Sequence, residues 1–564
     1  MSEPLTELAK RRGFYFQSSD AYGGASGFYT YGPQGAALKR NVIDAWRERF
    51  ITQEGHMEID APTVMGEPVF EASGHLDTFD DMIIECPACE RSFRADHLVE
   101  DETTIEDAEA MSFEAIEETI AENELSCPSC GNSLADVAVS AFNLMFETNI
   151  GPGSSAPGYL RPETAQGIFV EFPQLKEYAR NQLPFGVAQV GRAYRNEISP
   201  RRSIVRVREF TQAELELFID PERDTPSIDR VQNVTVPLYS ATAQEGDGEV
   251  VRMTIGDAVE DELVEEWIAY YLAIAAEWYE SVGIDMERFR YRQHRPDELS
   301  HYASDTWDAE VSVDGNWIEL TGFAYRGAYD LTKHDDYSNE EYTIFRQYDE
   351  PVTVEEPSVD PEMSVLGPEY GSDAGKIADE LASLAESDPD AFDAESVTVT
   401  VDGDAYTIAT DVANFSRTAT KNGEHITPHV VEPSFGVDRL LYTILAHNYR
   451  EDEVEGERRR SLSLPSSIAP TTVGVFPLMT KDGLDDRARE LARKLRVAGF
   501  TVTYDDSGQI GRRYRRQDEI GTPFCVTVDH ESLEDDTVTV RERDTMAQER
   551  VPVDALEDYL TERT

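Results

Sequence analysis

The spacing of apolar residues predicts that helices and strands alternate along the chain. Helical periodicity marks residues 31–50, 259–282 and 483–498. One face of the first helix is expected to carry Ala37, Val42, Ala45, Trp46 and Phe50. Short apolar runs that predict strands lie at 471–479, 500–504, 524–530 and 536–544. The chain is therefore expected to be a mixed α and β protein.

A basic hairpin is predicted over Gly191–Glu214. Its loop carries Pro200, Arg201 and Arg202, and residues 205–210 then alternate between apolar and charged side chains, which is the period of a half-buried strand. Guanidinium groups on such a hairpin suit planar anionic groups, because each guanidinium can donate hydrogen bonds to two phosphate oxygens at once. The alternative is a surface hairpin whose arginines are solvated.

Three further segments have recognisable patterns. A strand is expected to end at Pro62, which has no amide proton for a sheet ladder, and a loop to follow it. Residues 164–172 have helical spacing, with Glu163 near the helix start, where a carboxylate complements the helix dipole. Residues 428–449 combine a strand, a glycine turn and an apolar helix, with Arg439 just inside that helix.

Two polar segments, 221–258 and 335–425, are expected to be insertions. The first is predicted to be irregular. The second is predicted to contain a helix near 375–385 and a strand pair near 397–408.

A small domain is expected beyond a boundary near residues 463–470. Its strand–helix–strand order predicts an α/β fold with a parallel or mixed sheet. Residues 510–523 are expected to be a loop, and they carry a dense basic cluster, which favours a nucleic-acid contact over a solvated face. This cluster consists of Arg512, Arg513, Arg515 and Arg516.

The charge of the chain is strongly negative. The 564 residues contain 111 Asp and Glu against 50 Lys and Arg, a formal net charge of −61, and the acid is spread over every segment. This distribution indicates a solubility requirement and resembles adaptation to a cytoplasm of high salt. Such a charge repels nucleic acid unless local basic patches or strong screening oppose it.

Neither a secretory signal nor a membrane span is expected. The N-terminal segment has no apolar core of the signal type. No run reaches the roughly 18 apolar residues that a membrane span needs. A cytoplasmic protein is therefore predicted.

Four of the five cysteines form two C-x-x-C pairs, Cys86/Cys89 and Cys127/Cys130. Four thiolates complete a closed tetrahedral zinc shell, so the spacing predicts a structural zinc site in a reducing compartment. The alternative is a pair of turns whose cysteines hold no metal. The long acidic gap between the pairs, with helical spacing from Ile105 to Ile120, is expected to be a solvated helical excursion.

Four motifs carry a resemblance to a known family: RPETAQG at 161–167, RNEISPR at 195–201, REFTQAE at 208–214 and EPSFGVDR at 432–439. With them, the chain resembles glycyl-tRNA synthetases of the homodimeric type found in archaea and eukaryotes, which belong to the class II aminoacyl-tRNA synthetases. The segment around Pro62 resembles the dimer-forming motif 1, the basic hairpin motif 2, and residues 433–440 motif 3.

The resemblance implies an α/β (α+β) fold with a central antiparallel sheet flanked by helices. It implies the following domains: a catalytic domain at 1–85, 136–220, 259–334 and 426–462; a zinc-knuckle insertion at 86–135; insertions at 221–258 and 335–425; and an anticodon-binding domain at 463–564.

The resemblance also implies an ATP site. Arg195 would clamp the α-phosphate and Arg439 the γ-phosphate, and these two are the expected catalytic residues. Phe210 would stack on the adenine. The expected ATP-binding set is Arg195, Asn196, Glu197, Val205, Arg206, Val207, Arg208, Glu209, Phe210, Glu319, Leu320, Gly436, Val437, Asp438 and Arg439.

Glycine offers only an ammonium and a carboxylate for recognition. The family surrounds the ammonium with carboxylates, which here correspond to Glu163 and Glu214, with Ser434 close by. The expected glycine-binding set is Arg94, Glu163, Phe210, Thr211, Gln212, Ala213, Glu214, Glu432, Pro433, Ser434, Phe435 and Gly436. Tyr325 stands where many relatives have an acidic residue, which leaves the role of its loop in this site open.

The activity implied is glycine–tRNA ligase: glycine and ATP form glycyl-adenylate and pyrophosphate, and glycine is then transferred to the 3′ end of tRNA(Gly). ATP with Mg²⁺, structural Zn²⁺, tRNA(Gly) and a second copy of the chain are the expected cofactors and partners. Two alternatives are an inactive tRNA-binding relative and a class II enzyme for another small amino acid. Arg195 and Arg439 count against the first, and Glu163 with Glu214 against the second.

Overall fold

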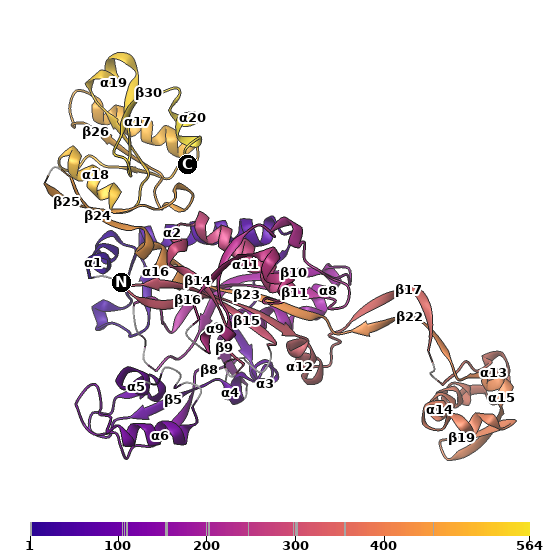
Figure 1. Cartoon of the computed structure of the whole chain (residues 1–564). Helices are drawn as coiled ribbons and strands as arrows, with labels where there is room; N and C mark the ends of the chain where they lie inside the picture. Colours follow the sequence, from indigo (N-terminus) through magenta and orange to yellow (C-terminus); the bar gives the residue numbers. More distant parts are fainter. Residues whose placement is uncertain are drawn as a thin grey trace. The chain divides into compact units, whose positions relative to one another are not determined.

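The computed structural model describes residues 3–103, 105, 108, 111–152, 156–198, 200, 203–245, 248–296, 298, 303–354, 357–454 and 456–564. Arg201 and Arg202, expected at the tip of the basic hairpin, lie outside these residues. The chain divides into two compact units, one of residues 1–342 with 428–564 and one of residues 343–427 (Figure 1).

A nine-stranded sheet forms the centre of the first unit, in the order β13-β12-β14-β15-β16-β23-β11-β10-β3. All neighbours are antiparallel except β10/β3 and β12/β14, which confirms the predicted antiparallel centre. The strands are β3 Met57–Ile59, β10 Phe185–Tyr194, β11 Glu209–Ile219, β12 Thr235–Tyr239, β13 Val251–Thr254, β14 Phe289–Gln293, β15 Asp305–Val313, β16 Asn316–Gly327 and β23 His429–Gly436.

The predicted basic hairpin is the β10–β11 pair, with Gly191 opposite Gln212. The returning strand begins at Glu209 and not at Val205, so the alternation of residues 205–208 was wrongly interpreted as strand. The amide of Arg208 donates to the Gly27 carbonyl at 2.8 Å, outside the β10–β11 ladder. Residues 203–208 therefore form turns that approach the N-terminal segment.

Helices pack on this sheet around a cluster of aromatic rings. Trp46 and Phe50, from α2 Pro33–Arg47 and the turn after it, contact Phe435 of β23, and Trp278 of α11 Glu266–Ser281 joins them. The predicted helix 259–282 is two helices, α10 Ile255–Glu260 and α11. A third, α16 Val437–Asn448, follows β23 directly, as the sequence predicted.

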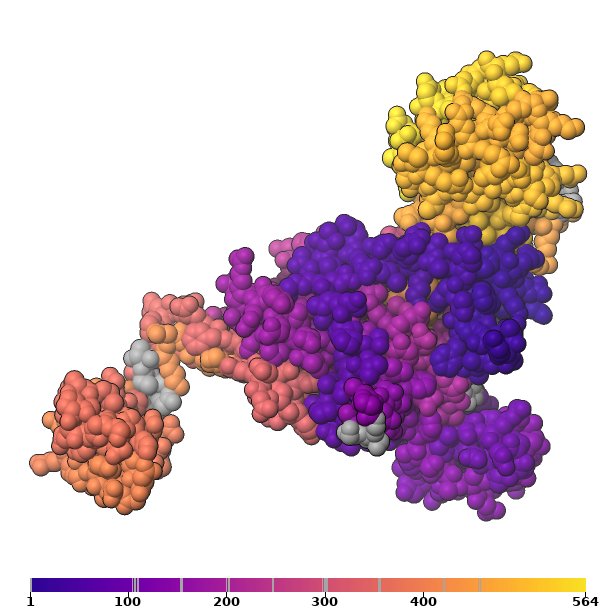
Figure 2. Space-filling model, turned by 180° about the vertical axis from the view of Figure 1, so that it is seen from behind, coloured from indigo at the N-terminus to yellow at the C-terminus, as the bar shows by residue number. Residues whose placement is uncertain are grey.

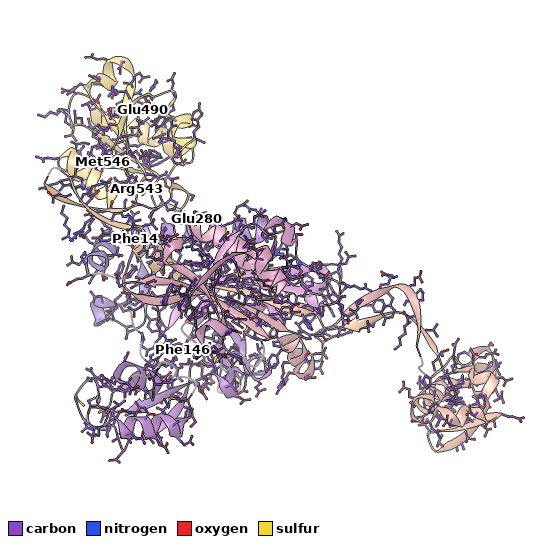
Figure 3. All side chains as sticks on the ribbon, in the orientation of Figure 1. Phe14, Phe146, Glu280, Glu490, Arg543 and Met546 are labelled. Atoms are coloured by element: carbon purple, nitrogen blue, oxygen red, sulfur yellow. The ribbon has the colours of Figure 1, made fainter. Side chains whose placement is uncertain are left out.

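The start of the chain packs closely against α2. It contains α1 Glu3–Arg12, β1 Tyr15–Gln17 and β2 Tyr29–Tyr31. Phe14, labelled in Figure 3, is fully buried. A Cβ atom on Gly35 would lie 1.8 Å from the Phe14 carbonyl oxygen, so only glycine fits this contact.

The loop predicted after Pro62 is instead ordered. It contains β4 Val64–Gly66, α3 Glu67–Ala72 and α4 His75–Thr78, and β4 pairs with β9 Pro157–Leu160, which in turn pairs with β8 Phe146–Asn149. The helix predicted at 164–172 is α7 Ala165–Val170, followed by α8 Phe172–Tyr178. The pairing of β4 with β9 joins residues far apart in the chain, so the local sequence gave too little signal to predict it.

The segment 221–258 was predicted to be irregular, and this was wrong. It supplies β12 and β13, which extend the central sheet to its edge, together with α9 Ala241–Gln244. The strand signal is weak because Pro237 interrupts a short apolar run.

The cysteine-containing segment forms a small subdomain with its own apolar core. Its strands are β5 Asp80–Glu85, β6 Ser92–Arg94 and β7 Val139–Asn143, and its helices are α5 Ala95–Glu102 and α6 Phe113–Glu122. Ile84, Leu98, Ile116 and Ile120 are buried in that core. The acidic excursion therefore has a helix that packs on one face, as its spacing predicted.

The second unit begins and ends with a two-stranded ribbon of β17 Ile344–Val354 and β22 Ala419–Ile426. Its globular part forms a compact body (Figure 2). The predicted helix is α14 Ala374–Ser387, and the predicted strand pair is β19 Ser396–Val401 with β20 Asp404–Ala409. The remaining elements are α13 Met363–Tyr370, α15 Thr410–Ala413, β18 Ser358–Val359 and β21 Phe415–Ser416.

The C-terminal domain has a mixed sheet of order β27-β26-β28-β29-β30, which confirms the predicted α/β fold. The first three strands are parallel and the others antiparallel. Its elements are β26 Val473–Pro477, α17 Leu484–Val497, β27 Val502–Tyr504, α18 Ile510–Asp518, β28 Phe524–Val528, α19 His530–Asp535, β29 Thr537–Glu542, β30 Gln548–Pro552 and α20 Leu556–Thr561.

The basic stretch 510–518 is the helix α18, so the predicted loop was wrong. Arg513 and Gln517 lie one turn apart and are both buried, which gives the helix a polar inner face that hydrophobic periodicity does not reveal.

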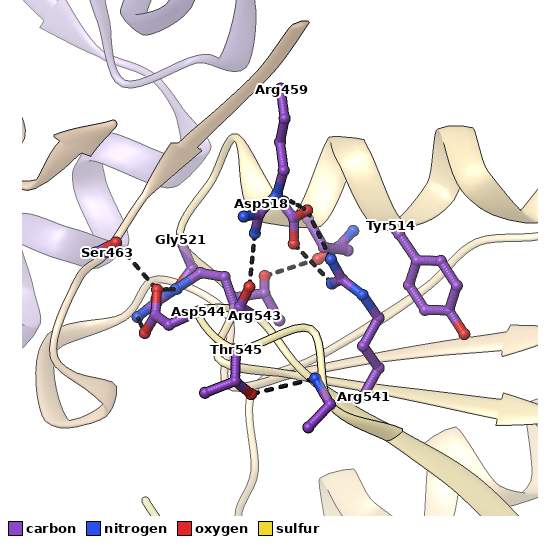
Figure 4. A network of polar contacts seen from close by, with 12 residues as sticks. Arg459, Ser463, Tyr514, Asp518, Gly521, Arg541, Arg543, Asp544 and Thr545 are labelled. Carbon is purple, nitrogen blue, oxygen red and sulfur yellow. Dashed lines mark hydrogen bonds and ion pairs between the residues drawn. The ribbon is translucent and has the colours of Figure 1, made fainter. Parts of the chain in front are cut away.

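Buried arginines connect this domain to the hairpin of β24 Tyr449–Val454 and β25 Glu457–Leu462 (Figure 4). Asp518, 1% exposed, accepts hydrogen bonds of 2.9 Å from both Arg459 and Arg541. Arg543 donates to the Gly521 carbonyl at 2.7 Å. Because each guanidinium is paired, the charges are compensated inside the protein.

Candidate active site

A cavity of about 240 Å³ opens on one face of the central sheet. Its walls come from β11, β15, β16 and β23, from the turns before β11 and from the start of α16. Many residues expected at the ATP and glycine sites line it: Glu163, Arg195, Glu197, Val205, Arg206, Val207, Phe210, Thr211, Gln212, Glu214, Glu319, Leu320, Glu432, Ser434, Gly436, Asp438 and Arg439.

Other expected residues do not line this cavity: Asn196, Arg208, Glu209, Ala213, Pro433, Phe435, Val437 and Arg94. Ala213, Phe435 and Val437 belong to the apolar core on the other face of the sheet. The Arg208 guanidinium donates to the carbonyls of Glu197 and Ser26. Alternation along β11 and β23 explains the core residues, because every second side chain faces away from the cavity.

Arg94, expected to bind glycine, lies in the cysteine-containing subdomain. It is 5% exposed, and its guanidinium pairs with Asp81 at 3.0 Å and with Asp96. In this structure Arg94 is thus paired with two acids of its own subdomain, and it does not line the cavity.

Arg195 is held at the cavity by two aromatic rings. Its guanidinium carbon lies 5.4 Å from the ring centres of Phe79 and Phe210, and its Nε donates to the Pro162 carbonyl at 3.3 Å. Cation–π contacts of this kind fix the guanidinium plane without neutralising its charge. The group can therefore meet an anion in the cavity.

Arg439 is fixed at the far end by β16 and by the turn before β11. Its Nη1 lies 2.9 Å from the Glu319 carboxylate, and its Nε donates to the Val205 carbonyl at 3.3 Å. The Arg439 charge is the main reason why the pKa of Glu319 is below its usual value. This end of the cavity pairs one guanidinium with one carboxylate.

Asp438 connects the start of α16 to β11. Its carboxylate accepts from the Thr211 amide at 2.5 Å, from the Lys39 Nζ at 3.3 Å and from the Tyr31 hydroxyl. These contacts hold the first turn of α16, which carries Arg439, against the hairpin that carries Phe210. Asp438 therefore orients the cavity wall.

Glu214 lies at the opposite end and is 1% exposed. One carboxylate oxygen accepts from Thr164 Oγ1 at 2.5 Å and the Ala165 amide at 2.7 Å; the other accepts from Gln212 Nε2 at 2.8 Å and Ser434 Oγ at 2.6 Å. Burial, and then the charge of nearby Glu163, raise the pKa of Glu214.

Glu163 accepts a 2.8 Å hydrogen bond from Gln166, and His75 Nε2 lies 3.6 Å away. Burial would raise the pKa of Glu163, but His75 and Arg326 oppose this, and the net pKa is lowered. The two glutamates thus form an electronegative end of the cavity that can receive a small cation.

Arg326 lines the same end, and the sequence did not predict it. It is 3% exposed and pairs with Glu432 at 2.8 Å and with Asp330 at 2.7 Å. Its neighbour Tyr325 points elsewhere, where its hydroxyl lies 2.9 Å from His429 Nδ1. Strand alternation after Leu320 was the available signal, because it places residues 322, 324 and 326 on the cavity face.

His294 and Asp308 also line the cavity without having been predicted. His294 Nε2 lies 2.9 Å from Asp308 Oδ2. Burial lowers the pKa of His294, but the hydrogen bond and the charge of Asp308 outweigh burial, and the net pKa is raised. The pKa of Asp308 is raised to about 6 by burial and then by Glu319. Asp308 and Glu319 thus repel each other when both are ionised, which a divalent cation would relieve.

The four predicted zinc ligands lie together. All four Sγ atoms are within 4.8 Å of one another, with Cys86 and Cys130 at 3.6 Å and Cys89 and Cys127 at 3.7 Å. Bonds of about 2.3 Å in a tetrahedron place sulfur atoms about 3.8 Å apart. The cluster therefore has the donors and spacing that zinc requires.

The four arginines of α18 do not share one environment. Arg512 and Arg515 are exposed, Arg516 pairs with Asp505, and Arg513 is 3% exposed. Arg513 donates to the carbonyls of Asp506 and Gly508 at 2.9 and 2.7 Å, and to that of Pro477. Arg512 and Arg515 are thus the two members of the cluster that are exposed at the surface of this helix.

Among the described residues, no helix combines the length and apolar composition needed to cross a membrane.

Two family descriptions match the chain. The tRNA synthetase class II core domain (G, H, P, S and T) matches residues 155–448, which contain the cavity. The anticodon binding domain matches residues 472–563, which form the C-terminal domain.

Similar proteins share the whole length. Glycine–tRNA ligase of Methanothrix thermoacetophila is 48% identical and aligns over 99% of this chain and 96% of its own. Those of Methanocaldococcus jannaschii and Methanothermobacter thermautotrophicus are 44% and 43% identical, over 100% and 98% of this chain and 98% and 97% of theirs.

A solved structure shares the fold. The prolyl-tRNA synthetase of Cryptosporidium parvum complexed with L-proline and AMP superposes with a TM-score of 0.51 at 12% identity, over 99% of this chain and 75% of its own.

Proposed function

The chain belongs to the family of glycine–tRNA ligases, and on this premise we propose how the residues of its cavity divide the reaction. As a class II synthetase, it activates glycine with ATP to glycyl-adenylate and pyrophosphate, and then transfers glycine to the 3′ end of tRNA(Gly). The observation that carries the division is that one cavity holds both the arginines Arg195 and Arg439 and the acids Glu163 and Glu214.

Arg195 holds the α-phosphate of ATP. A carboxylate oxygen of glycine forms a bond to the α-phosphorus while the bond from that phosphorus to the bridging oxygen of pyrophosphate breaks. No general base is needed, because the attacking carboxylate is already ionised. Arg195 contributes by positioning the phosphate and stabilising the charge that develops on it. Its place between Phe79 and Phe210 supports this role.

Arg439 binds the γ-phosphate and Phe210 stacks on the adenine. Asp438 supports both, since it joins the helix of Arg439 to the strand of Phe210. The remaining wall residues frame the nucleotide: Glu197, Val205, Arg206, Val207, Leu320 and Gly436.

Class II synthetases use ATP with Mg²⁺. Glu319 and Asp308 are the residues that would hold this ion, because their carboxylates line the cavity and destabilise each other in its absence. The ion supplies positive charge to the phosphate oxygens.

Glu163, Glu214 and Ser434 receive the glycine ammonium. The acids attract the cation, while the hydrogen bonds to Glu214 fix its carboxylate in place. Larger amino acids are rejected because the pocket leaves no space for a side chain. Steric exclusion can exceed the roughly 1–3 kcal/mol that separates substrates by one methylene.

Four finer features complete the proposal. The Cys86, Cys89, Cys127 and Cys130 cluster holds a structural zinc ion, as its donor set supports. The enzyme works in the cytoplasm of a halophile, which the acidic composition favours. It works as a homodimer, which the resemblance of the segment around Pro62 to motif 1 supports. Exposed arginines of α18 meet the tRNA, and the C-terminal domain is its anticodon-binding part.

Glycine-dependent exchange of pyrophosphate into ATP, measured in multi-molar KCl, tests the proposal. We expect exchange with glycine and far less with alanine or serine. Equal exchange with all three would remove the assigned selectivity, and no exchange with any of them would remove the assigned catalytic roles.

A further inference from the structure

Glu216 is a buried acid next to the cavity. The reaction described above does not use this acid. Its side chain is 0% exposed, and neither carboxylate oxygen has a hydrogen-bond partner among the described residues. It does not line the cavity. A buried carboxylate with no hydrogen bonds is costly, which calls for an explanation.

Strand geometry places Glu216 beside the acids of the glycine end. It follows Glu214 by two residues on β11, so both side chains point to the same face of the sheet. The pairs Glu214/Ser434 and Leu217/Val431 set the register with β23, which puts Glu216 across from Glu432. Like charges directly opposite each other destabilise a sheet.

The Arg326 guanidinium, which opposes the rise in the pKa of Glu216, is already paired with other acids. Arg326 donates to Glu432 through Nη1 at 2.8 Å, and to Asp330 through Nε at 2.7 Å and Nη2 at 2.8 Å. None of its nitrogens is a hydrogen-bond partner of Glu216. Arg326 therefore compensates Glu432 and Asp330, and leaves Glu216 without a cation hydrogen-bonded to it.

The charged groups that act on Glu216 come from four elements: Glu214 on β11, Glu432 on β23, Arg326 on β16 and Asp330 on α12 Tyr329–Tyr337. Burial comes first and Glu432 second in raising the pKa of Glu216 well above its usual value, against the opposing charge of Arg326. Burial and the facing carboxylate therefore both favour the protonated form of this acid.

We propose that Glu216 is a specificity-determining positioning residue, which carries a proton and so sets the charge of the ammonium pocket. As a neutral acid, it fills the space next to Glu432 without repelling it. Glu432 then stays paired with Arg326. Glu163 and Glu214 remain the two carboxylates that face the glycine ammonium. This inference rests on the proposed placement of glycine at that end.

Ionisation of Glu216 at alkaline pH changes this arrangement. The new carboxylate has no hydrogen-bond partner, and it repels Glu432 and Glu214 across and along the strands. The cluster must then rearrange or take up an ion, which displaces the acids that orient the ammonium. Glycine recognition is therefore lost at alkaline pH, while ATP recognition at the other end is kept.

Glu216→Gln tests the proposal, because glutamine imitates the neutral acid but cannot ionise. We expect kcat/KM for glycine, from pyrophosphate exchange, to stay within about threefold of wild type at about pH 7. As the pH rises into the alkaline range, the ratio of variant to wild type should grow to about tenfold or more. The KM for ATP should be the same in both at each pH.

Glycine loses its own ammonium proton at alkaline pH, but this affects both enzymes alike and cancels in their ratio. Glu214→Gln is the matched control on the same strand and face, and it should lose kcat/KM for glycine at every pH. Infrared difference spectra of wild type and Glu216→Gln supply a direct readout, since the wild type should show the carbonyl band of a protonated carboxylic acid.

Glu216→Met checks that the effect is one of charge and not of folding. It should melt at or above the wild-type temperature, and its kcat/KM for glycine should change with alkaline pH in the same way as that of Glu216→Gln. The inference would be overturned if kcat/KM for glycine fell with alkaline pH equally in wild type and both variants. It would also be overturned if the infrared difference spectrum showed no carboxylic-acid band. A loss above about tenfold in Glu216→Gln at about pH 7 would overturn it too, because such a loss would make Glu216 an ionised ligand. Absence of glycine-dependent exchange in wild type would instead overturn the proposed function.

Discussion

The Ser434 hydroxyl donates a 2.6 Å hydrogen bond to the Glu214 carboxylate across the β11–β23 strand pair. It is one of four hydrogen bonds that hold this buried acid in place. The amino-acid end of the cavity is therefore built from two strands that are more than 200 residues apart in sequence, since the bond spans 220 positions.

Ser434→Ala should weaken glycine recognition selectively. A hydrogen bond to a charged group contributes about 1.5–3 kcal/mol, so KM for glycine should rise about 10- to 100-fold while KM for ATP stays unchanged. Pyrophosphate exchange at varied glycine and ATP measures both. Equal rises in the two constants would show a general distortion of the sheet. Ser434→Thr, which keeps the hydroxyl, is the control.

Arg195→Ala should abolish exchange without changing the fold. Among the described residues, the side chain contacts Phe79 and Phe210 at the cavity and donates a hydrogen bond to the Pro162 carbonyl. Its removal takes away the charge assigned to the α-phosphate, and we expect a loss of at least about 100-fold in kcat, comparable to other lost transition-state donors.

Arg195→Lys should restore little of that activity, because an ammonium cannot reproduce the planar fork between two rings. Circular dichroism and the oligomeric state check that each variant is folded. Activity retained in Arg195→Ala would remove this residue from the reaction.

The cysteine cluster should contain about one zinc per chain by elemental analysis. Cys86→Ser should lower the zinc content and loosen the subdomain of residues 80–143, which limited proteolysis detects as new cleavage there. Cys525→Ser is the matched control, since Cys525 is buried in β28, far from the cluster in sequence. An equal zinc content in both variants would argue against this site.

Exposed and buried arginines of α18 should respond differently to mutation. Arg512→Glu and Arg515→Glu should each raise KM for tRNA. Each should also reduce the slope of the logarithm of the binding constant against the logarithm of the salt concentration by about one, the value for one phosphate contact. Exchange, which needs no tRNA, should not change. Binding of tRNA should be measured at the lowest salt concentration at which the enzyme is folded, because screening weakens the attraction between arginine and phosphate.

Arg513→Ala should instead destabilise the C-terminal domain by about 2 kcal/mol or more, since it removes the hydrogen bonds that this buried guanidinium donates to the carbonyls of Pro477, Asp506 and Gly508. Denaturant unfolding gives this value. A tRNA defect in Arg513→Ala without any loss of stability would reverse the assignment.

Glu265 makes stability depend on pH. It caps α11 through a 3.0 Å hydrogen bond from the Ile268 amide, yet burial, its largest influence, raises its pKa to about 7. A carboxyl with a raised pKa in the folded state stabilises the protein below its unfolded pKa of about 4.3, and this contribution is lost as pH rises to about 7.

Glu265→Gln should therefore melt at a temperature that exceeds wild type by an amount growing between about pH 4.5 and 7, reaching a few degrees. Above that range the difference should be constant. Glu266→Gln, next to it on an exposed position, is the control and should show no such trend. A constant difference across the whole range would assign the effect to the cap alone.

Local patterns predicted the elements whose signal lies within a few residues. The basic hairpin, α14, the β19–β20 pair and the mixed sheet of the C-terminal domain follow from periodicity and turns. The cysteine cluster follows from spacing, because two C-x-x-C turns each present both sulfurs to one point.

Two of the failures share one cause, which is pairing with distant residues. Residues 235–239 are a strand because β13 and β14 flank them, although Pro237 obscures the local pattern. Residues 205–208 alternate like a strand, but contact with Gly27 draws the chain out of the sheet. In both cases long-range hydrogen bonds override local propensity.

By itself, the sequence determined the class of the fold, the positions of its motifs and the residue types that the chemistry needs, because these depend on order and spacing. Tertiary structure alone decided which of those residues share the cavity. It paired Arg94 with two acids of its own subdomain, buried Arg513 in the C-terminal domain, brought Arg326, His294 and Asp308 to the site, and placed the buried acid Glu216 opposite Glu432. Burial and proximity set charge and pKa, and neither is encoded in any short stretch of chain.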